Sequence, residues 1–88
     1  MKVEFKSSFA RDLRKLRDQE AQRRVQHLIG LVEQSSSLDA VPGVKKLQSP
    51  GEYYRIRIGD YRIGVAIADS TVVFVRILHR RNIYRYFP

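Results

Sequence analysis

The 88-residue chain contains no cysteine. Without thiols it can form no disulfide framework, thiolate nucleophile or cysteine-based zinc site, and such a composition suits a reducing cytosol. The sequence also lacks a run of about 18 apolar residues, which a membrane span requires. Residues 1–5 do not begin an apolar signal core. We therefore expect a cytoplasmic protein with no membrane partner.

The motifs of several common catalytic sites are also missing. We find no glycine-rich phosphate loop, no pair of carboxylates at acid/base spacing, no metal-ligand cluster and no visible Ser/His/Asp set. We accordingly expect neither a metal nor another cofactor. Phosphate chemistry carried out by cations remains open. In ribonucleolytic cleavage the 2′-hydroxyl of the RNA attacks the adjacent phosphorus, so the protein need only orient the strand, stabilise negative charge and move protons.

Positive charge, by contrast, is abundant. Seventeen Lys and Arg against nine Asp and Glu give a formal net charge of +8, which indicates a polyanionic or acidic partner. Residues 51–88 hold seven arginines, no lysine and three acids. Arginine binds phosphate bidentately and stacks on aromatic rings, as lysine does not. Aromatic residues lie among these arginines, a mixture suited to phosphates and unstacked bases: Tyr53, Tyr54, Tyr61, Tyr84, Tyr86 and Phe87. A solvated basic surface over core aromatics is the alternative interpretation.

Apolar periodicity predicts a strand and two helices in the N-terminal half. Residues 2–5 alternate between charged and apolar side chains, which is typical of a short strand. Ser7 or Ser8 is placed to cap a first helix. Asp18 is placed to cap a second helix that ends near Gln34. We expect the two helices to form a hairpin.

The C-terminal half predicts a sheet. Residues 35–51 are the only linker-like stretch, and a loop of this length is uncommon unless it packs or has a function. Residues 53–58, 61–68 and 71–78 are rich in β-branched side chains and predict a three-stranded antiparallel meander. The order strand, helix hairpin, meander predicts one α+β domain over residues 1–88, with the helices packed on one face of one sheet.

The first hairpin of the meander carries clustered arginines. The two-residue loop Gly59-Asp60 is a hairpin signal that places Arg57 opposite Arg62. Alternation puts Arg55 on the same face. Like charges that face each other across a ladder are destabilising. We therefore interpret the cluster as a site for an anion.

The register of the last strand decides the direction of Arg76. A strict two-residue turn at Asp69-Ser70 would align Arg76 with the core face, whereas a three-residue or bulged turn would bring Arg76 and Arg80 to the face of the arginines. Burying an unpaired guanidinium costs several kcal/mol, so we expect the second arrangement. The tail, residues 79–88, is expected to form a short turn of helix.

Three segments resemble a known family: Val44-Lys45-Lys46-Leu47, Tyr54-Arg55-Ile56-Arg57-Ile58-Gly59-Asp60-Tyr61-Arg62 and His79-Arg80-Arg81-Asn82-Ile83-Tyr84. Together with the strand and helices before them, they resemble the RelE/ParE superfamily of type II toxins over essentially the whole chain. The resemblance implies a RelE-like fold and a cognate antitoxin, bound in a hetero-oligomer. The RelE branch, which the short tail favours, implies metal-independent cleavage of mRNA in the ribosomal A site, hence translation inhibition and growth arrest. The ParE branch implies binding to DNA gyrase without chemistry of its own.

The resemblance to RelE also implies roles for single residues. Arg62 and Arg80 would bind the scissile phosphate, and Arg81 would replace Arg80 if the register slips by one. Tyr84 would stack on the base or orient it. Tyr53, which lies among the arginines, is expected to contact the RNA.

Two positions depart from the best-known RelE proteins, which have lysines where this chain has Arg55 and Arg57. Arginine stays protonated at neutral pH and is a poor base, so these two residues are expected to bind phosphates. Proton transfer then needs another group. His79 is the candidate acid/base catalyst and Glu52 a weaker one. The alternative for His79 is a strand-end histidine that bonds only to the backbone.

Overall fold

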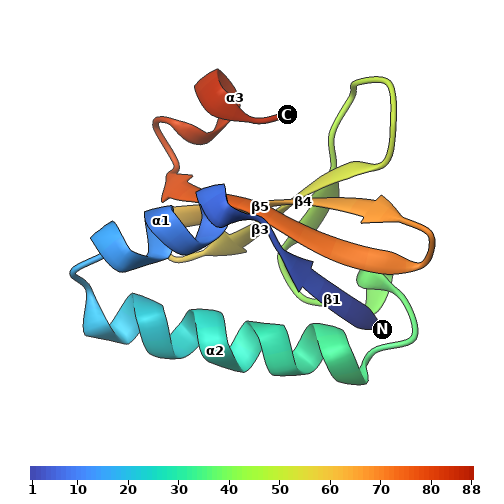
Figure 1. Cartoon of the computed structure of the whole chain (residues 1–88), viewed down its shortest axis with the longest axis horizontal. Helices are drawn as coiled ribbons and strands as arrows, with labels where there is room; N and C mark the ends of the chain where they lie inside the picture. The colour runs from blue at the N-terminus through green and yellow to red at the C-terminus, as the bar shows by residue number, and fades with distance from the viewer.

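A five-stranded mixed sheet is the centre of the structure, a computed structural model that describes all 88 residues (Figure 1). The elements are β1 (Lys2–Phe5), α1 (Ser7–Lys15), α2 (Gln19–Gln34), the 3₁₀ helix η1 (Leu38–Ala40), β2 (Val44–Lys46), β3 (Tyr53–Ile58), β4 (Tyr61–Ala68), β5 (Thr71–His79) and α3 (Ile83–Tyr86). The strand order is β1-β5-β4-β3-β2, and β1 runs parallel to β5. The predicted α+β class and single sheet are confirmed. The predicted three-stranded antiparallel meander is incomplete, because β1 and β2 extend it at both edges.

The expected linker contains the second edge strand. Within it, β2 pairs antiparallel with β3, and Lys45 faces Arg55. Three residues are too few for alternation to reveal a strand, which is why the sequence did not predict it. Leu38 and Val41 of the same segment are buried in the core. The long connection is therefore packed structure.

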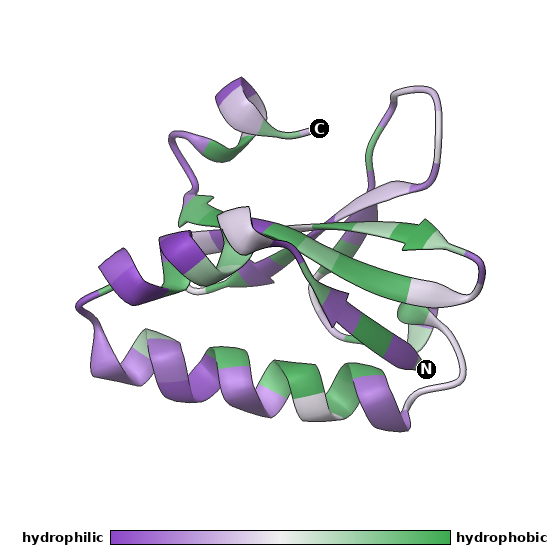
Figure 2. Cartoon of the chain, in the orientation of Figure 1, coloured by the Kyte–Doolittle hydropathy of each residue, from purple (hydrophilic) through white to green (hydrophobic).

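The sheet buries one face against the helices. Val25, Leu28 and Val32 of α2 are buried, and Figure 2 shows the corresponding alternation of apolar and polar segments along this helix. From α1, the ring of Phe9 packs edge-on against Phe74 of β5, with the centroids 5.4 Å apart. These side chains stabilise the fold because each buried aliphatic or aromatic group contributes about 1.5–3 kcal/mol.

One of the two predicted helix caps is present. The Asp18 carboxylate accepts a hydrogen bond from the Ala21 amide at 3.0 Å and caps α2, as predicted. The predicted serine cap of α1 is wrong, because Lys6 is the N-cap residue and makes no side-chain cap bond. Ser8 instead donates its hydroxyl to the carbonyl of Val75 on β5. This bond attaches α1 to the edge of the sheet beyond the end of β1.

A bulge in β5 determines where Arg76 points. The turn at Asp69-Ser70 is a strict two-residue turn in which both residues have positive φ. The ladder shifts register between Gly64 and Val65, which leaves Val75 as an extra residue. Arg76 consequently leaves the core face, as we expected. The bulged turn that we expected is wrong, since the irregularity lies inside the strand.

The chain ends on the sheet face opposite α2, where Figure 1 shows α3 above the strands. The short helix expected in the tail is therefore confirmed. Ile83 and Phe87 are buried there, and Phe87 meets the ring of Tyr53 edge-on at 5.8 Å. No helix of the structure is both long and apolar enough to cross a membrane.

Candidate functional site

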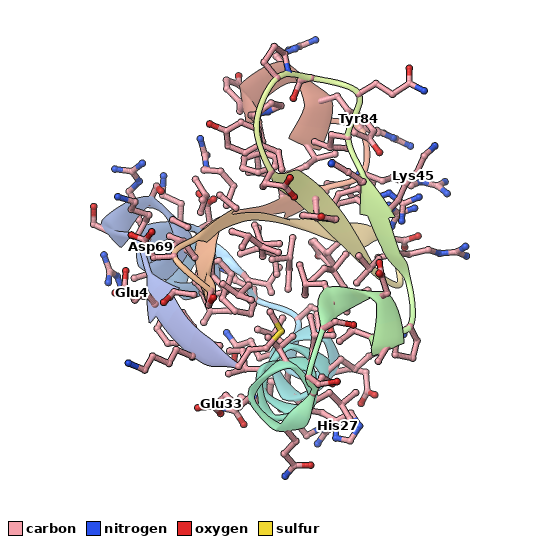
Figure 3. All side chains as sticks on the ribbon, turned by 90° about the vertical axis from the view of Figure 1, so that its right-hand side faces the viewer. Glu4, His27, Glu33, Lys45, Asp69 and Tyr84 are labelled. Carbon is pink, nitrogen blue, oxygen red and sulfur yellow. The ribbon has the colours of Figure 1, made fainter.

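Four arginines gather on the sheet face that carries α3, and we call this set the arginine face: Arg55, Arg57, Arg62 and Arg80. Arg57 and Arg62 lie directly opposite each other in the β3–β4 ladder, as the hairpin signal predicted. The pKa of Arg62 is lowered, first by burial and then by the positive charges of Arg55, Arg57 and Arg80. Figure 3 shows many nitrogen-tipped side chains near Lys45, on the side of the molecule where Tyr84 lies. The structure therefore brings the predicted phosphate-binding residues together.

The hairpin turn fixes the guanidinium of Arg62. Its Nη1 donates to the carbonyl oxygens of Gly59 at 2.8 Å and Tyr61 at 2.9 Å. Gly59 has a positive φ of 54°, which the tight turn requires. Both bonds use one nitrogen, so the other guanidinium nitrogens remain available to an anion.

The C-terminal helix brings a hydroxyl to this cluster. Arg55 donates from Nε to the Tyr84 hydroxyl oxygen at 3.3 Å and from Nη1 to the Gly43 carbonyl at 2.9 Å. The side chain of Tyr84 is well exposed, with 60% of the residue surface accessible. Its ring and its own O–H group are thus open to a ligand beside Arg55.

The structure distinguishes the two late arginines. The Arg80 amide donates to the Asp60 carbonyl at 2.8 Å, which ties the end of β5 to the β3–β4 turn. The charge of Arg80 acts on Arg62. Arg81 is exposed, and its amide donates to Nδ1 of His79 at 3.2 Å. Arg80 and not Arg81 therefore belongs to the arginine face.

His79 lies on the other side of the sheet. It pairs with Tyr61 in the ladder, and the two rings meet edge-on at 5.9 Å. Tyr61 packs against the core, so this face is the one that the helices cover. His79 also lines a small depression with Asp12 and Leu16 of the α1 region. The expectation that His79 joins the arginines is not met, and its ring nitrogen bonds to the backbone instead.

The other two candidates are also engaged elsewhere. The Glu52 carboxylate accepts a hydrogen bond from the Tyr54 hydroxyl at 2.9 Å and lies 3.5 Å from Nζ of Lys46. The hydrogen bond from Tyr54, and then the charge of Lys46, lower the pKa of Glu52. Tyr53 is half-buried against Phe87, where it supports the tail. Neither residue stands free beside Arg62.

Sequence analysis missed one cation of this surface. Lys45 faces Arg55 across the β2–β3 ladder and is exposed. Lys45 lies in one of the segments that resemble the family, but the direction of its side chain depends on β2, which the sequence did not predict. The backbone carbonyl of Gly43, which orients Arg55, was missed for the same reason.

Comparisons with known proteins identify the family. The family model of the ParE toxin of the type II toxin–antitoxin system parDE matches residues 3–84. The curated Toxin RelE3 of Methanocaldococcus jannaschii is 40% identical over 89 residues, which span 100% of both chains. The chain belongs to the RelE/ParE superfamily of type II toxins. The predicted resemblance is therefore confirmed.

Solved structures agree with this assignment. The toxin matches the RelB-RelE antitoxin–toxin complex from Methanococcus jannaschii with a TM-score of 0.84 and 37% identity, over 98% of this chain and 100% of that chain. It matches the archaeal RelE-RelB complex from Pyrococcus horikoshii OT3 with a TM-score of 0.75 over 93% and 97% of the two chains. At 22% identity, the second match shows the shared fold.

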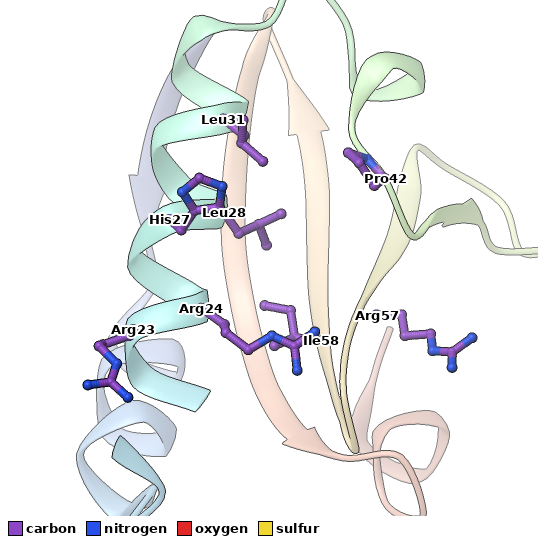
Figure 4. A pocket seen from close by; sticks show the side chains of 8 residues that line it. All are labelled: Arg23, Arg24, His27, Leu28, Leu31, Pro42, Arg57 and Ile58. Atoms are coloured by element: carbon purple, nitrogen blue, oxygen red, sulfur yellow. The ribbon is translucent and has the colours of Figure 1, made fainter. Parts of the chain in front are cut away.

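A groove of about 390 Å³ adjoins the arginine face of this toxin, between α2 and β3 (Figure 4). Basic side chains surround it, from Arg23, Arg24 and His27 of α2 and from Arg57 of β3. Its interior is lined by apolar side chains, Leu28, Leu31, Pro42 and Ile58, and no acid lines it. Arg57 belongs to both the groove and the arginine face.

Proposed function

We propose that this toxin is a ribosome-dependent endonuclease of mRNA that inhibits translation in the cytoplasm. The observation that carries the proposal is the convergence of Arg55, Arg57 and Arg80 on Arg62, beside the exposed hydroxyl of Tyr84. Positive charges that face each other across a ladder destabilise the folded chain unless an anion lies between them. A phosphodiester supplies that anion, and guanidinium groups suit its geometry.

The proposed reaction requires no group beyond these residues and the RNA. The 2′-oxygen of the RNA forms a bond to the adjacent phosphorus while the bond from phosphorus to the 5′-oxygen breaks, which leaves a cyclic phosphate and a 5′-hydroxyl. Arg62 and Arg80 stabilise the charge that develops on the phosphoryl oxygens. Arg55 and Arg57 bind the phosphates of the RNA strand. Tyr84 donates its proton to the departing 5′-oxygen, and the proton of the 2′-hydroxyl passes to solvent.

We further propose that a cognate antitoxin binds this toxin in a hetero-oligomer. The matched relatives from Methanococcus jannaschii and Pyrococcus horikoshii were crystallised with RelB. The net charge of +8 favours an acidic partner. The groove beside Arg57 combines aliphatic side chains with cations, which fits an acidic segment that carries apolar residues. A carboxylate bound at Arg57 would also block the arginine face.

The test is primer extension on a defined mRNA held in programmed ribosomes. Wild-type toxin is compared with Arg62→Ala and with Arg11→Ala, which removes one exposed arginine of α1 far along the chain from the arginine face. We expect new 5′ ends, which stop the reverse transcript within A-site codons, for wild type and Arg11→Ala and none for Arg62→Ala. Intact mRNA in the presence of a folded toxin that still arrests growth would overturn the proposal.

Gyrase poisoning is the second candidate, because the matching family model is named for the ParE toxin. Under this function the arginines would contact protein and the toxin would catalyse nothing. The discriminating assay is supercoiling by purified gyrase with added toxin. Inhibited supercoiling together with intact mRNA on ribosomes would assign the ParE activity.

A further inference from the structure

Arg76 lies on the same side of the sheet as the residues of the arginine face, but a carboxylate binds its guanidinium. Its Nε lies 2.7 Å from Oδ2 of Asp12, and its Nη2 lies 3.1 Å from Oδ1. Asp12 is 8% exposed, and its Oδ2 also accepts the Ile77 amide at 3.1 Å. The hydrogen bond that Arg76 donates to Asp12 is the main cause of a raised pKa of Arg76. This pair therefore fixes one guanidinium in a single place at the edge of β5.

The same guanidinium lies over the last residue of the C-terminal helix. The carbon Cζ of Arg76 is 5.6 Å from the centroid of the Tyr86 ring, which is the geometry of a cation–π contact. Tyr86 is 55% exposed, so this contact is not part of the core. Asp12, Arg76 and Tyr86 thus form a chain of contacts from α1 across the edge of β5 to α3.

The short helix α3 depends on such contacts for its orientation. It spans only Ile83–Tyr86, and an isolated turn of helix is unstable in water. Ile83 in the helix and Phe87 directly after it anchor the turn to the sheet, and the exposed tyrosines are placed by contacts on its two sides. Tyr84 on one side bonds to Arg55, and Tyr86 on the other side contacts Arg76.

We infer that Asp12 and Arg76 are positioning residues for Tyr84. Neither touches the arginine face, and both act through Tyr86 and α3 on the hydroxyl that stands beside Arg55. The effect on RNA cleavage rests on the proposed function. The effect on the position of α3 does not.

The experiment is a double-mutant cycle with Arg76→Lys and Tyr86→Leu in the full chain. Arg76→Lys keeps the charge beside Asp12 but loses the planar fork. Tyr86→Leu loses the aromatic face, and Tyr86→Phe retains it. A cation–π contact at an exposed site is worth about twofold to fivefold in an equilibrium constant. We expect amide exchange of Arg85 and Phe87 to quicken by about this factor in each variant, with the β4 and β5 amides unchanged and Tyr86→Phe like wild type.

On programmed ribosomes we expect kcat to fall about threefold in each variant at unchanged KM, and no further in the double variant. Asp12→Asn, which keeps an oxygen for the Ile77 amide, should behave like Arg76→Lys. Additive losses in the double variant, or faster exchange throughout the sheet, would overturn the inference. If wild-type toxin leaves mRNA intact, the proposed nuclease fails while the exchange measurements still decide whether Arg76 holds α3.

Discussion

The ring of Phe87 occupies the space in which a side chain at Gly64 would stand. A Cβ at Gly64 would lie 2.5 Å from Cδ2 of Phe87, closer than van der Waals contact allows. Gly64 sits in the central strand β4, and Phe87 is 3% exposed. Because Gly64 has no side chain, the ring of Phe87 can pack directly on the backbone of β4. This contact docks the C-terminal tail, which carries Tyr84.

The first prediction concerns the packing of Phe87 on Gly64. Gly64→Ala should displace Phe87 and lower the free energy of unfolding by about 1–3 kcal/mol, the range for overpacking. It should also reduce RNA cleavage, because α3 no longer holds Tyr84 beside Arg55. Thermal unfolding and primer extension measure the two effects. The double variant Gly64→Ala/Phe87→Leu, with a smaller and more adaptable side chain, should recover part of the stability, and unaltered stability of the single variant would contradict this account.

The second prediction concerns the loss of folding stability caused by repulsion within the arginine face. The pKa of Arg62 is lower in the folded chain than in the unfolded chain. Its positive charge therefore destabilises the fold at every pH below the folded pKa, and this loss of stability vanishes only above the pKa of Arg62 in the unfolded chain. Arg57→Gln removes the charge directly opposite Arg62. We expect it to raise the free energy of unfolding by about 0.5 kcal/mol at low salt. The gain should shrink as salt screens the repulsion.

Arg11→Gln is the matched control, since it removes one exposed positive charge outside the arginine face. Both variants are compared by urea unfolding at low and high ionic strength. Arg57→Gln should also cleave RNA more slowly, whereas Arg11→Gln should not. An equal stability gain in the two variants would assign the effect to net charge alone.

Local patterns explain why part of this architecture was predictable. The Gly59-Asp60 signal determines the hairpin register and hence the pairing of Arg57 with Arg62. Asp18 caps α2 because its carboxylate reaches the first free amides of the helix. Arg55, Arg57 and Arg62 of the arginine face needed only the hairpin register and the alternation of side chains along β3, whereas the direction of Arg80 depends on the bulge in β5.

The features that were missed depend on contacts between distant segments. No residue type marks Val75 as a bulge, and its carbonyl is satisfied by Ser8, far away in the sequence. The strand β2 is stabilised by its partner β3 rather than by its own pattern. His79 was proposed from its residue type alone, although alternation from Arg76 and Arg80 on the outer face already turns it to the other face.

The third prediction uses the position of His79. Since His79 and the arginine face lie on opposite sides of the sheet, His79→Gln should retain cleavage within about threefold of wild type. Tyr84→Phe should lose about a hundredfold, the usual contribution of general acid catalysis. With the 2′-hydroxyl proton passing to solvent, the single-turnover rate should rise with pH throughout the range of about 6 to 8.

The measurement is the pH–rate profile of wild type, His79→Gln and Tyr84→Phe on programmed ribosomes. Arginine side chains remain charged over this whole range, so the affinity for the RNA strand should not change with pH. An inflection within this range in wild type that vanishes in His79→Gln would instead identify His79 as the base, acting through a rearrangement of the end of β5.

The fourth prediction tests the bulge by deleting single valines from β5. Without Val75, Arg76 follows Phe74 directly and still faces Gly64, so the ladder becomes regular and every later side chain keeps its face. The deletion should cost about 1 kcal/mol, because one hydrogen bond from Ser8 is lost. Deletion of Val73 also removes one valine, but it moves Phe74 to the outer face and puts Val75 in the core.

Phe74 is fully buried and packs against Phe9, so the Val73 deletion should cost roughly 3 kcal/mol or more. Urea unfolding of the two variants measures the difference. Retained cleavage by the Val75 deletion would further show that Arg62, Arg76 and Arg80 keep their places without the bulge. If the Val75 deletion were the less stable of the two, Val75 would be a structural part of the sheet edge that α1 needs, and not a spare residue that sets the register.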